Sequence, residues 1–335
     1  MSDPVVSILL PAFDADATLA ACLRSVERQT ERRWECVVVD DGSRDGTLAC
    51  ARAFAARDGR FRVLAASHRG LVAALNVGLD ECRAPLVARM DADDVMHRER
   101  LAAQVAALEA APGLTALGCH VRIFPRGGMT SGLRAYERWL ASIDSPARVR
   151  AEAFVECPVA HPTLMIRRDV VARLGYRDRP WPEDYDLVLR LLAAGHEVSV
   201  VPRRLVAWRD GPSRLSRTDR RYGLERFTAC KAAFLAEGFL RGAESYVLWG
   251  YGETGRALRR ALLAHGKRPS EVIEVHPGRV GQRIHGAPVV SVEEWMRRPR
   301  GPLVASVAGE EPRGRIRSAC AAIGLRETQD FVCAA

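Results

Sequence analysis

Short apolar runs alternate with helix-periodic stretches over the first 95 residues, and this pattern restricts the fold more than any other feature. The apolar runs lie at 5–10, 35–43, 61–66 and 84–91. Between them, Leu19, Cys22, Leu23 and Val26 recur at helical spacing, and 46–57 and 71–82 also have helical character. Such alternation predicts an α/β fold with a mostly parallel sheet and helices on both faces.

Acidic residues follow two of the predicted strands. Asp40 and Asp41 end the second strand, and Asp91 ends the fourth. In open α/β sheets, ligands bind beyond the carboxyl ends of the strands. We therefore expect both acidic clusters to lie on the same edge of the sheet.

The sequence "DADD" at 91–94 has two interpretations. One of its carboxylates could cap the helix predicted in the following stretch, "VMHRERLAAQVAALEA". A cap needs only one carboxylate, whereas Mg²⁺ or Mn²⁺ commonly binds through one or two carboxylates together with substrate phosphates. Both interpretations stay open at this point.

Two further acidic stretches each have a structural and a functional interpretation. In "VVVDDGSRDGT", a turn explains Gly42, while adjacent carboxylates at 40 and 41 could accept hydrogen bonds from a base or a ribose. In "RPWPEDYDLVLRLLAAG", Glu183 and Asp184 open a predicted helix. They either compensate the helix dipole or supply a general base.

A second strand–helix pattern begins at 245, so we predict a domain at 1–240, a basic linker at about 209–243 and a small Rossmann-like α/β domain at 244–335. The stretch "GYGETG" joins its first strand and helix. Gly250, Gly252, Gly255 and the later Glu274 predict a nucleotide-binding site, unless the glycines only serve a tight turn.

The net charge restricts the class of binding partner, and the cysteine content restricts the cellular compartment. The net charge of +9 favours anionic partners such as nucleoside diphosphates or phospholipid head groups. Aromatic residues make up only 6% and do not interleave with the arginines, so nucleic acid is not expected. Nine scattered cysteines and the absence of a long apolar run predict a cytoplasmic protein. The linker arginines form either a solvated face or a peripheral contact with the anionic inner membrane face; they are Arg214, Arg217, Arg220, Arg221 and Arg226.

In their order and spacing, six motifs resemble family 2 glycosyltransferases of the GT-A fold, especially bacterial members that build exopolysaccharide and O-antigen chains. The resemblance runs from about Val5 to about Arg217. The motifs are "SILLPAFDADATLAACLRSV", "VVVDDGSRDGT", "RGLVAALNVGL", "VARMDADD" with "RERL", "HPTLMIRR" and "PEDYDLVLRLLAAG".

The resemblance implies donor-binding, metal-binding and catalytic positions. Asp93, with Asp91, would ligate Mn²⁺ or Mg²⁺, and Asp184 would be the general base with Glu183 beside it. Asn76 would lie in a nucleotide-facing loop. The donor-binding positions would be Pro11, Phe13, Asp40, Asp41, Asn76, Asp91 and His161.

Three departures from the family pattern affect these expectations. Asp14 stands where the family usually has Asn, and Leu75 stands where many members carry an Arg near the base. The second departure weakens the assignment of a uridine donor. Asp210 stands where relatives often have a His that would be a third metal ligand.

The resulting prediction is a metal-dependent, inverting glycosyltransferase. It would move a sugar from a nucleoside-diphosphate-sugar, with UDP favoured, to a saccharide or lipid-linked saccharide in cell-surface polysaccharide synthesis. Two alternatives are a nicotinamide-dependent oxidoreductase built on "GYGETG" and a non-catalytic nucleotide-sugar-binding protein.

Overall fold

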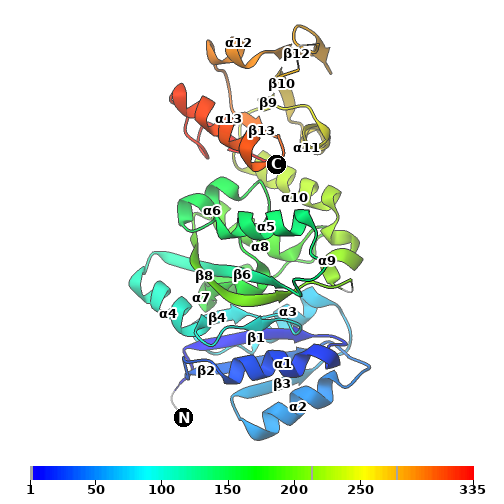
Figure 1. The fold of residues 1–335 in the computed structure, drawn as a ribbon, viewed down its shortest axis with the longest axis vertical. Helices are drawn as coiled ribbons and strands as arrows, with labels where there is room; N and C mark the ends of the chain where they lie inside the picture. The colour runs from blue at the N-terminus through cyan, green and yellow to red at the C-terminus, as the bar shows by residue number, and fades with distance from the viewer. Residues whose placement is uncertain (1–2, 213, 277) are drawn as a thin grey trace. The chain divides into compact units, whose positions relative to one another are not determined.

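The computed structural model of the chain describes residues 3–212, 214–276 and 278–335 (Figure 1). The chain divides into two compact units. Unit 1 comprises Met1–Val149, Val159–Arg179 and Arg190–Arg214, and unit 2 comprises Arg150–Pro158, Pro180–Leu189 and Leu215–Ala335.

Unit 1 is built on a sheet of eight strands in the order β3-β2-β1-β4-β7-β6-β8-β5. The strands β1, β2, β3 and β4 are mutually parallel, and β6 is parallel to β8. The pairs β4–β7, β6–β7 and β5–β8 are antiparallel. The strand bounds are β1 (Val6–Ala12), β2 (Trp34–Asp40), β3 (Phe61–Ala65), β4 (Leu86–Arg89), β5 (Val95–Met96), β6 (Leu114–Phe124), β7 (Met165–Arg167) and β8 (Glu197–Arg209).

The helices of unit 1 pack on both faces of this sheet, and two further helices, α6 and α8, are divided between the units. The helices of unit 1 are α1 (Asp16–Glu27), α2 (Thr47–Arg57), α3 (Leu71–Asp80), α4 (Arg100–Ala110), α5 (Ser131–Ala141), the short 3₁₀ helix η1 (His161–Thr163) and α7 (Arg168–Leu174). The divided helices are α6 (Pro146–Glu152) and α8 (Glu183–Ala193).

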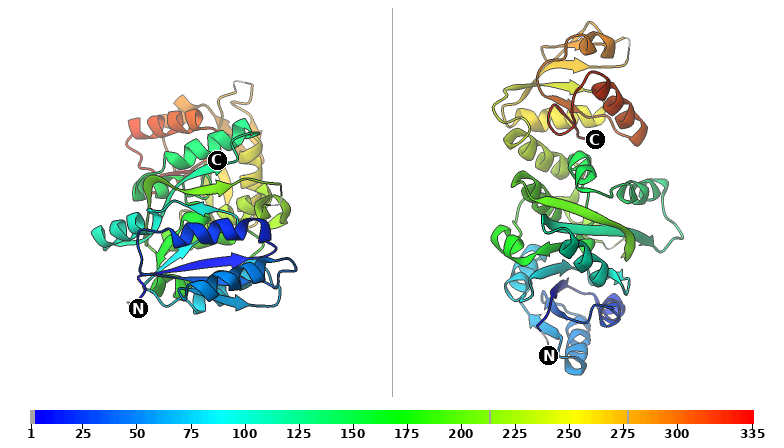
Figure 2. Two further views of the ribbon diagram at one scale, coloured as in Figure 1. Left: turned by 60° about the horizontal axis from the view of Figure 1, so that its bottom comes forward. Right: turned by 90° about the vertical axis from the view of Figure 1, so that its left-hand side faces the viewer.

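Successive side chains of β1 and β2 point to opposite faces of the sheet, and each face packs against its own layer of helices. Ile8 and Val38 belong to one buried cluster with residues of α1 and α2. Leu9 and Val39 point to the other face, where they meet Gly78 of α3. Figure 2 accordingly shows α1 and α2 together on one side of the first strands. Because every residue of both strands is buried, they read as continuous apolar runs in the sequence.

Unit 2 contains a second sheet of six strands in the order β11-β12-β10-β9-β13-β14. All of its pairs are parallel except β11–β12. Its core strands run outward from β9 to β10 and β12 on one side and to β13 and β14 on the other. This reversal of direction at the first strand is the topology of Rossmann-like sheets.

The element bounds of unit 2 place its sheet after Ser245. The strands are β9 (Ser245–Trp249), β10 (Arg268–Ile273), β11 (Arg283–Ile284), β12 (Ala287–Val290), β13 (Leu303–Ala305) and β14 (Phe331–Cys333). The helices are α9 (Leu215–Thr218), the 3₁₀ helix η2 (Arg220–Tyr222), α10 (Leu224–Glu237), α11 (Glu253–Leu263), α12 (Val292–Met296) and α13 (Glu310–Ala322).

The predicted α/β class is confirmed by both sheets. The predicted domain boundary near 240 stays a prediction. Unit 2 includes two segments from inside the predicted first domain, at 150–158 and 180–189. These segments make contacts that local sequence patterns cannot predict. Arg317 pairs with Glu152 at 3.0 Å, and Lys231 donates to the carbonyl oxygen of Val155 at 2.6 Å.

Within the described ranges, no helix has both the length and the hydropathy required to cross a bilayer.

The contact between α3 and the sheet generates a prediction for stability. A Cβ added at Gly78 would lie 2.4 Å from Cδ1 of Leu9 and 2.7 Å from Cγ2 of Val39, both fully buried. We expect Gly78→Ala to lower the free energy of unfolding by ~1–3 kcal/mol through overpacking. Gly132→Ala is the matched control, because the nearest atom to its added Cβ is Oγ1 of Thr130 at 4.0 Å. Chemical denaturation checks both, and equal stabilities for the two variants would contradict the prediction.

Candidate active site

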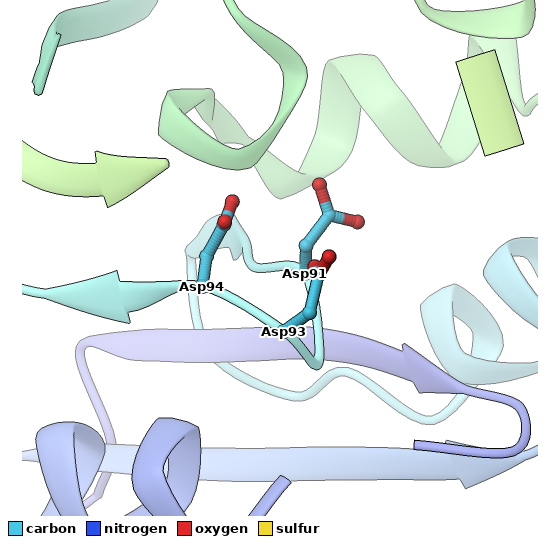
Figure 3. Close-up of side chains that lie close together, drawn as sticks. All are labelled: Asp91, Asp93 and Asp94. Atoms are coloured by element: carbon cyan, nitrogen blue, oxygen red, sulfur yellow. The ribbon is translucent and has the colours of Figure 1, made fainter. Parts of the chain in front are cut away.

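Three carboxylates converge on the loop that follows β4. Asp91, Asp93 and Asp94 each offer an oxygen, and these oxygens lie within 4.8 Å of one another. Figure 3 shows the three side chains rising from this loop toward the same side. Asp94 is fully buried, whereas Asp91 and Asp93 are partly exposed. The cluster therefore has a closed base and an accessible rim.

The helix-cap interpretation of "DADD" is wrong. Helix α4 begins at Arg100 and its N-cap residue is Glu99. The strand β5 lies between the acidic cluster and that helix, because Val95 and Met96 pair with β8. The three aspartates are consequently too far along the chain to satisfy the amide groups of α4.

The environment of Asp94 is suited to a cation. Its Oδ1 accepts a hydrogen bond of 2.6 Å from the backbone amide of Arg209. Its Oδ2 is buried and has no hydrogen-bond partner among the residues that the structure describes. Burial, followed by the charges of Asp91 and Asp93, raises the pKa of Asp94 well above its usual value. A buried carboxylate oxygen without a donor is costly, and a divalent ion would offset this cost.

The other two carboxylates are held differently. Asp91 forms an ion pair with the buried guanidinium of Arg89. Burial and the neighbouring charge of Asp91 raise the pKa of Asp93. An oxygen-only cluster of this kind fits Mg²⁺ or Mn²⁺ rather than a softer metal.

Asp40 and Asp41 are both buried at the end of β2. Asp41 accepts hydrogen bonds of 2.9 Å from the amides of Arg69 and Gly70, so it fixes the loop that precedes α3. Asp40 accepts from the amide of Ser43 at 3.3 Å through one oxygen. Its other oxygen is buried without a partner within the described part of the chain. Asp41 thus has a structural role, and Asp40 retains an unused acceptor.

An exposed aromatic pair lies beside this loop. Phe13 is 42% exposed, and its ring stacks on that of His68 with the centroids 4.1 Å apart. Nδ1 of His68 lies 2.8 Å from a carboxylate oxygen of Asp41, which orients the imidazole ring. Pro11 is buried inside β1, next to this pair in the chain. The pair offers a flat surface on which a planar ring could stack.

Asn76 lies in helix α3, not in a loop as predicted. Its side-chain nitrogen donates to the carbonyl oxygen of Tyr176, and its side-chain oxygen accepts from the amide of Tyr176, both at 2.9 Å. The hydroxyl of Tyr176 lies 3.1 Å from Nε2 of His161, which is buried in η1. Asn76 and His161 therefore belong to one hydrogen-bonded network around Tyr176.

The carboxylates predicted for proton transfer lie in unit 2, at the start of α8. Glu183 is buried and accepts a 2.7 Å hydrogen bond from the hydroxyl of Tyr222. Asp184 accepts from the amide of Tyr185 at 2.7 Å. Both side chains lie in the first turn of α8, where the helix dipole interacts favourably with acidic residues.

The glycine motif of unit 2 is explained by backbone packing. Gly250 has a φ of +95°, and a Cβ there would lie 2.3 Å from a side-chain carbon of Val307. A Cβ at Gly255, inside α11, would lie 2.1 Å from the carbonyl oxygen of Gly250. Glu274 pairs with Arg279 at 3.1 Å. Gly252 has open space around it. The turn interpretation is sufficient for this motif, so we propose no nucleotide site in unit 2.

Sequence reasoning missed three residues of the candidate site. Asp94 was visible in "DADD", but its burial against β8 was not. Arg89 carries no local signal, because it reads as part of an apolar strand, and His68 lies in a stretch without periodicity. Only their contacts with Asp91 and Phe13 distinguish them.

Comparison with known proteins identifies the class. The chain matches the family described as "Glycosyl transferase family 2" over residues 7–175. The match covers half of the chain, and the chain belongs to this family of glycosyltransferases. It is 29% identical over 252 residues to the amylovoran biosynthesis glycosyltransferase AmsE of Erwinia amylovora, which covers 72% of this chain and 91% of that protein.

Two solved structures share the GT-A fold of the chain. Staphylococcus aureus TarS 1–349 in complex with UDP-GlcNAc aligns with a TM-score of 0.56 at 15% identity, covering 78% of this chain and 72% of that one. The mannosyltransferase PcManGT from Pyrobaculum calidifontis, in complex with GDP-Man and Mn²⁺, aligns with a TM-score of 0.53 at 17% identity. The alignment covers 97% of this chain and 82% of that one.

The network around Tyr176 generates a prediction for pH dependence. Burial, reinforced by the charge of Arg89, lowers the pKa of His161 well below 6.5. As the pH falls below about 6.5, the unfolded chain binds a proton that the folded chain does not, so stability decreases until the folded pKa is reached. When the pH is lowered from about 7.5 to about 5.5, the free energy of unfolding should decrease less for His161→Gln than for the natural protein. Denaturant unfolding at both pH values measures this.

The control for this experiment is His265→Gln, because His265 is exposed. It should lose as much stability as the natural protein over the same range. If His161→Gln also behaves like the natural protein, His161 does not resist protonation in the folded state.

Proposed function

We propose that the protein is a metal-dependent, inverting glycosyltransferase of cell-surface polysaccharide synthesis. The observation that carries the proposal is the cluster of three carboxylates with one buried, unpartnered oxygen on Asp94, in a chain of glycosyl transferase family 2. The name of AmsE supports a role in polysaccharide synthesis. The cytoplasm is the proposed compartment, where nucleotide-sugar donors are made available to such enzymes.

The donor is a nucleoside-diphosphate-sugar, and the base binds at the aromatic pair. Phe13 and His68 present a stacking surface, and the free acceptor on Asp40 suits a base or ribose donor group. UDP is favoured by the complex of TarS, whereas the complex of PcManGT contains GDP-Man. Leu75 is buried and offers the base no polar group, so GDP-sugars and dTDP-sugars are alternative donors.

The metal site comprises Asp91 and Asp93, with Asp94 at its base. Arg89 holds Asp91 in place through their ion pair. A divalent cation bound there supplies positive charge to the departing diphosphate. PcManGT in complex with Mn²⁺ supports this choice of metal.

Asp184 is the proposed general base. It accepts a proton from a hydroxyl of a saccharide or lipid-linked saccharide acceptor. Attack on the sugar face opposite the leaving group inverts the anomeric carbon. Glu183 supports Asp184 from the same helix turn and is itself fixed by Tyr222. The evidence for this assignment is the family resemblance of "PEDYD" and its place at a helix start.

The donor and metal assignment predicts a coupled thermal shift. A UDP-, GDP- or dTDP-sugar at about 100 times its dissociation constant should stabilise the protein by ~2.7 kcal/mol, but only when Mn²⁺ is present. Asp93→Ala should abolish the metal-dependent part of the shift. Asp169→Ala is the control, because Asp169 is an exposed carboxylate on α7. A full shift without metal, or in Asp93→Ala, would refute the metal site.

The base assignment predicts a separation of binding from transfer. Asp184→Asn should bind the donor normally and transfer sugar about 10²–10⁴ times more slowly. Glu183→Gln should bind the donor equally well and lose less activity, since its role is to support Asp184. Single-turnover assays and donor titration measure the two quantities. If Glu183→Gln were the slower variant, the roles of the two carboxylates would be exchanged.

A further inference from the structure

Unit 1 carries a basic groove. It has a volume of about 670 Å³, and none of the three aspartates lines it. Five arginines contribute to its lining. Two come from α1 and the residue that follows it, one from the segment after β5, one from β6 and one from β8. They are Arg24, Arg28, Arg98, Arg122 and Arg204, and no Asp or Glu lines the groove.

The arginines of this groove are mostly not neutralised by the protein. Arg98 lies 3.9 Å from a carboxylate oxygen of Glu99, but Glu99 also pairs with Arg203. Across the described ranges, Arg24, Arg122 and Arg204 have no carboxylate within 4 Å. All three are exposed. Unpaired positive charges around one depression repel each other, so their arrangement favours an anionic ligand.

The chemistry of the lining restricts this ligand. Guanidinium groups bind phosphate and carboxylate oxygens through paired hydrogen bonds. Apart from Ser25 and His97, the rest of the lining is apolar, with Val95, Ala21 and Ala207 partly exposed. No Phe, Tyr or Trp is among the lining residues, so the exposed imidazole of His97 is the one aromatic ring that the lining offers to a base. Phosphate recognition above an aliphatic floor fits an anionic phospholipid better than a nucleotide or nucleic acid.

The basic linker predicted from the sequence is a weaker candidate for this role. Arg214 lies over the ring of Trp208 and near Asp210, and Arg221 pairs with Asp219 at 2.8 Å. Protein groups already use these two charges. The groove is therefore the basic surface with more charge available for an external anion.

We propose that the arginine groove of unit 1 docks the protein on an anionic phospholipid surface. This inference does not depend on glycosyl transfer, because lipid binding is measured without donor or acceptor. The arginine side chains reach the head-group phosphates, and their aliphatic stems with the groove floor contact the region below the head groups.

The test is co-sedimentation of the whole protein with vesicles. Vesicles of phosphatidylcholine alone are compared with an equimolar mixture of phosphatidylcholine and phosphatidylglycerol. We expect binding to the mixture only, with strong weakening as salt increases. R24E/R122E/R204E should bind the mixed vesicles on the order of 100-fold more weakly than the natural protein. Each arginine near an anionic surface contributes about fivefold to the affinity, and the three factors multiply.

The matched control is R52E/R83E/R134E. These three arginines are exposed, lie outside the groove, and give the same change in net charge. The control should keep most of the binding, and both variants should keep the metal-dependent donor shift. Equal loss in the two variants would overturn the proposal, because net charge alone would then explain binding. Binding to neutral vesicles would overturn it as well.

Competition separates a membrane from a free phosphate ligand. Glycerol phosphate or inorganic diphosphate, added at constant ionic strength, should leave vesicle binding unchanged. Displacement by either would show that the groove takes a soluble phosphorylated ligand and would overturn the membrane assignment. If circular dichroism shows that the charge-reversal variant is unfolded, R24Q/R122Q/R204Q provides the same comparison with a smaller expected loss.

Discussion

The position of β1 between β2 and β4 is the constraint on which the rest of the site depends. Ala12 pairs with Asp40 across one edge of β1, and Leu9 pairs with Arg89 across the other. Because these strands are parallel, both acidic segments leave the sheet at the same edge. The full burial of β1 fixes this register, since a slip by one residue would exchange the residues facing α1 with those facing α3.

The site combines rigid supports with groups that lack internal partners. Asp41 fixes the loop before α3, and Asn76 connects α3 to Tyr176. In contrast, Asp40 and Asp94 each keep a buried carboxylate oxygen for which the described residues provide no donor. Groups of this kind lower the stability of a fold unless a ligand satisfies them. Their concentration at the edge of a well-packed sheet is typical of a ligand site, where a bound cation or nucleotide recovers the lost interactions.

The loops that follow the strands have different roles in the two units. At the carboxyl edge of the first sheet, Asp40 and Asp94 each keep a carboxylate oxygen that has no partner among the described residues. In the second sheet, the glycines after β9 are needed because backbone and side chains approach closely, and Glu274 is paired with Arg279. A glycine-rich turn between a strand and a helix is therefore evidence for close packing first. A ligand requires additional groups that are left available.

The sequence by itself determined the α/β class, the position of "DADD" after a buried strand and the start of α8, because apolar periodicity and chain punctuation are local properties. The family resemblance carried the assignment of most candidate residues. Only the tertiary structure decided that "DADD" does not cap α4, since β5 pairs with β8 before the helix begins. It also decided the burial of Asp94, whose partner Arg209 lies 115 residues away. The arginine groove likewise unites α1, β6 and β8, which no local pattern connects, because side chains distant in sequence meet only after the sheet has formed.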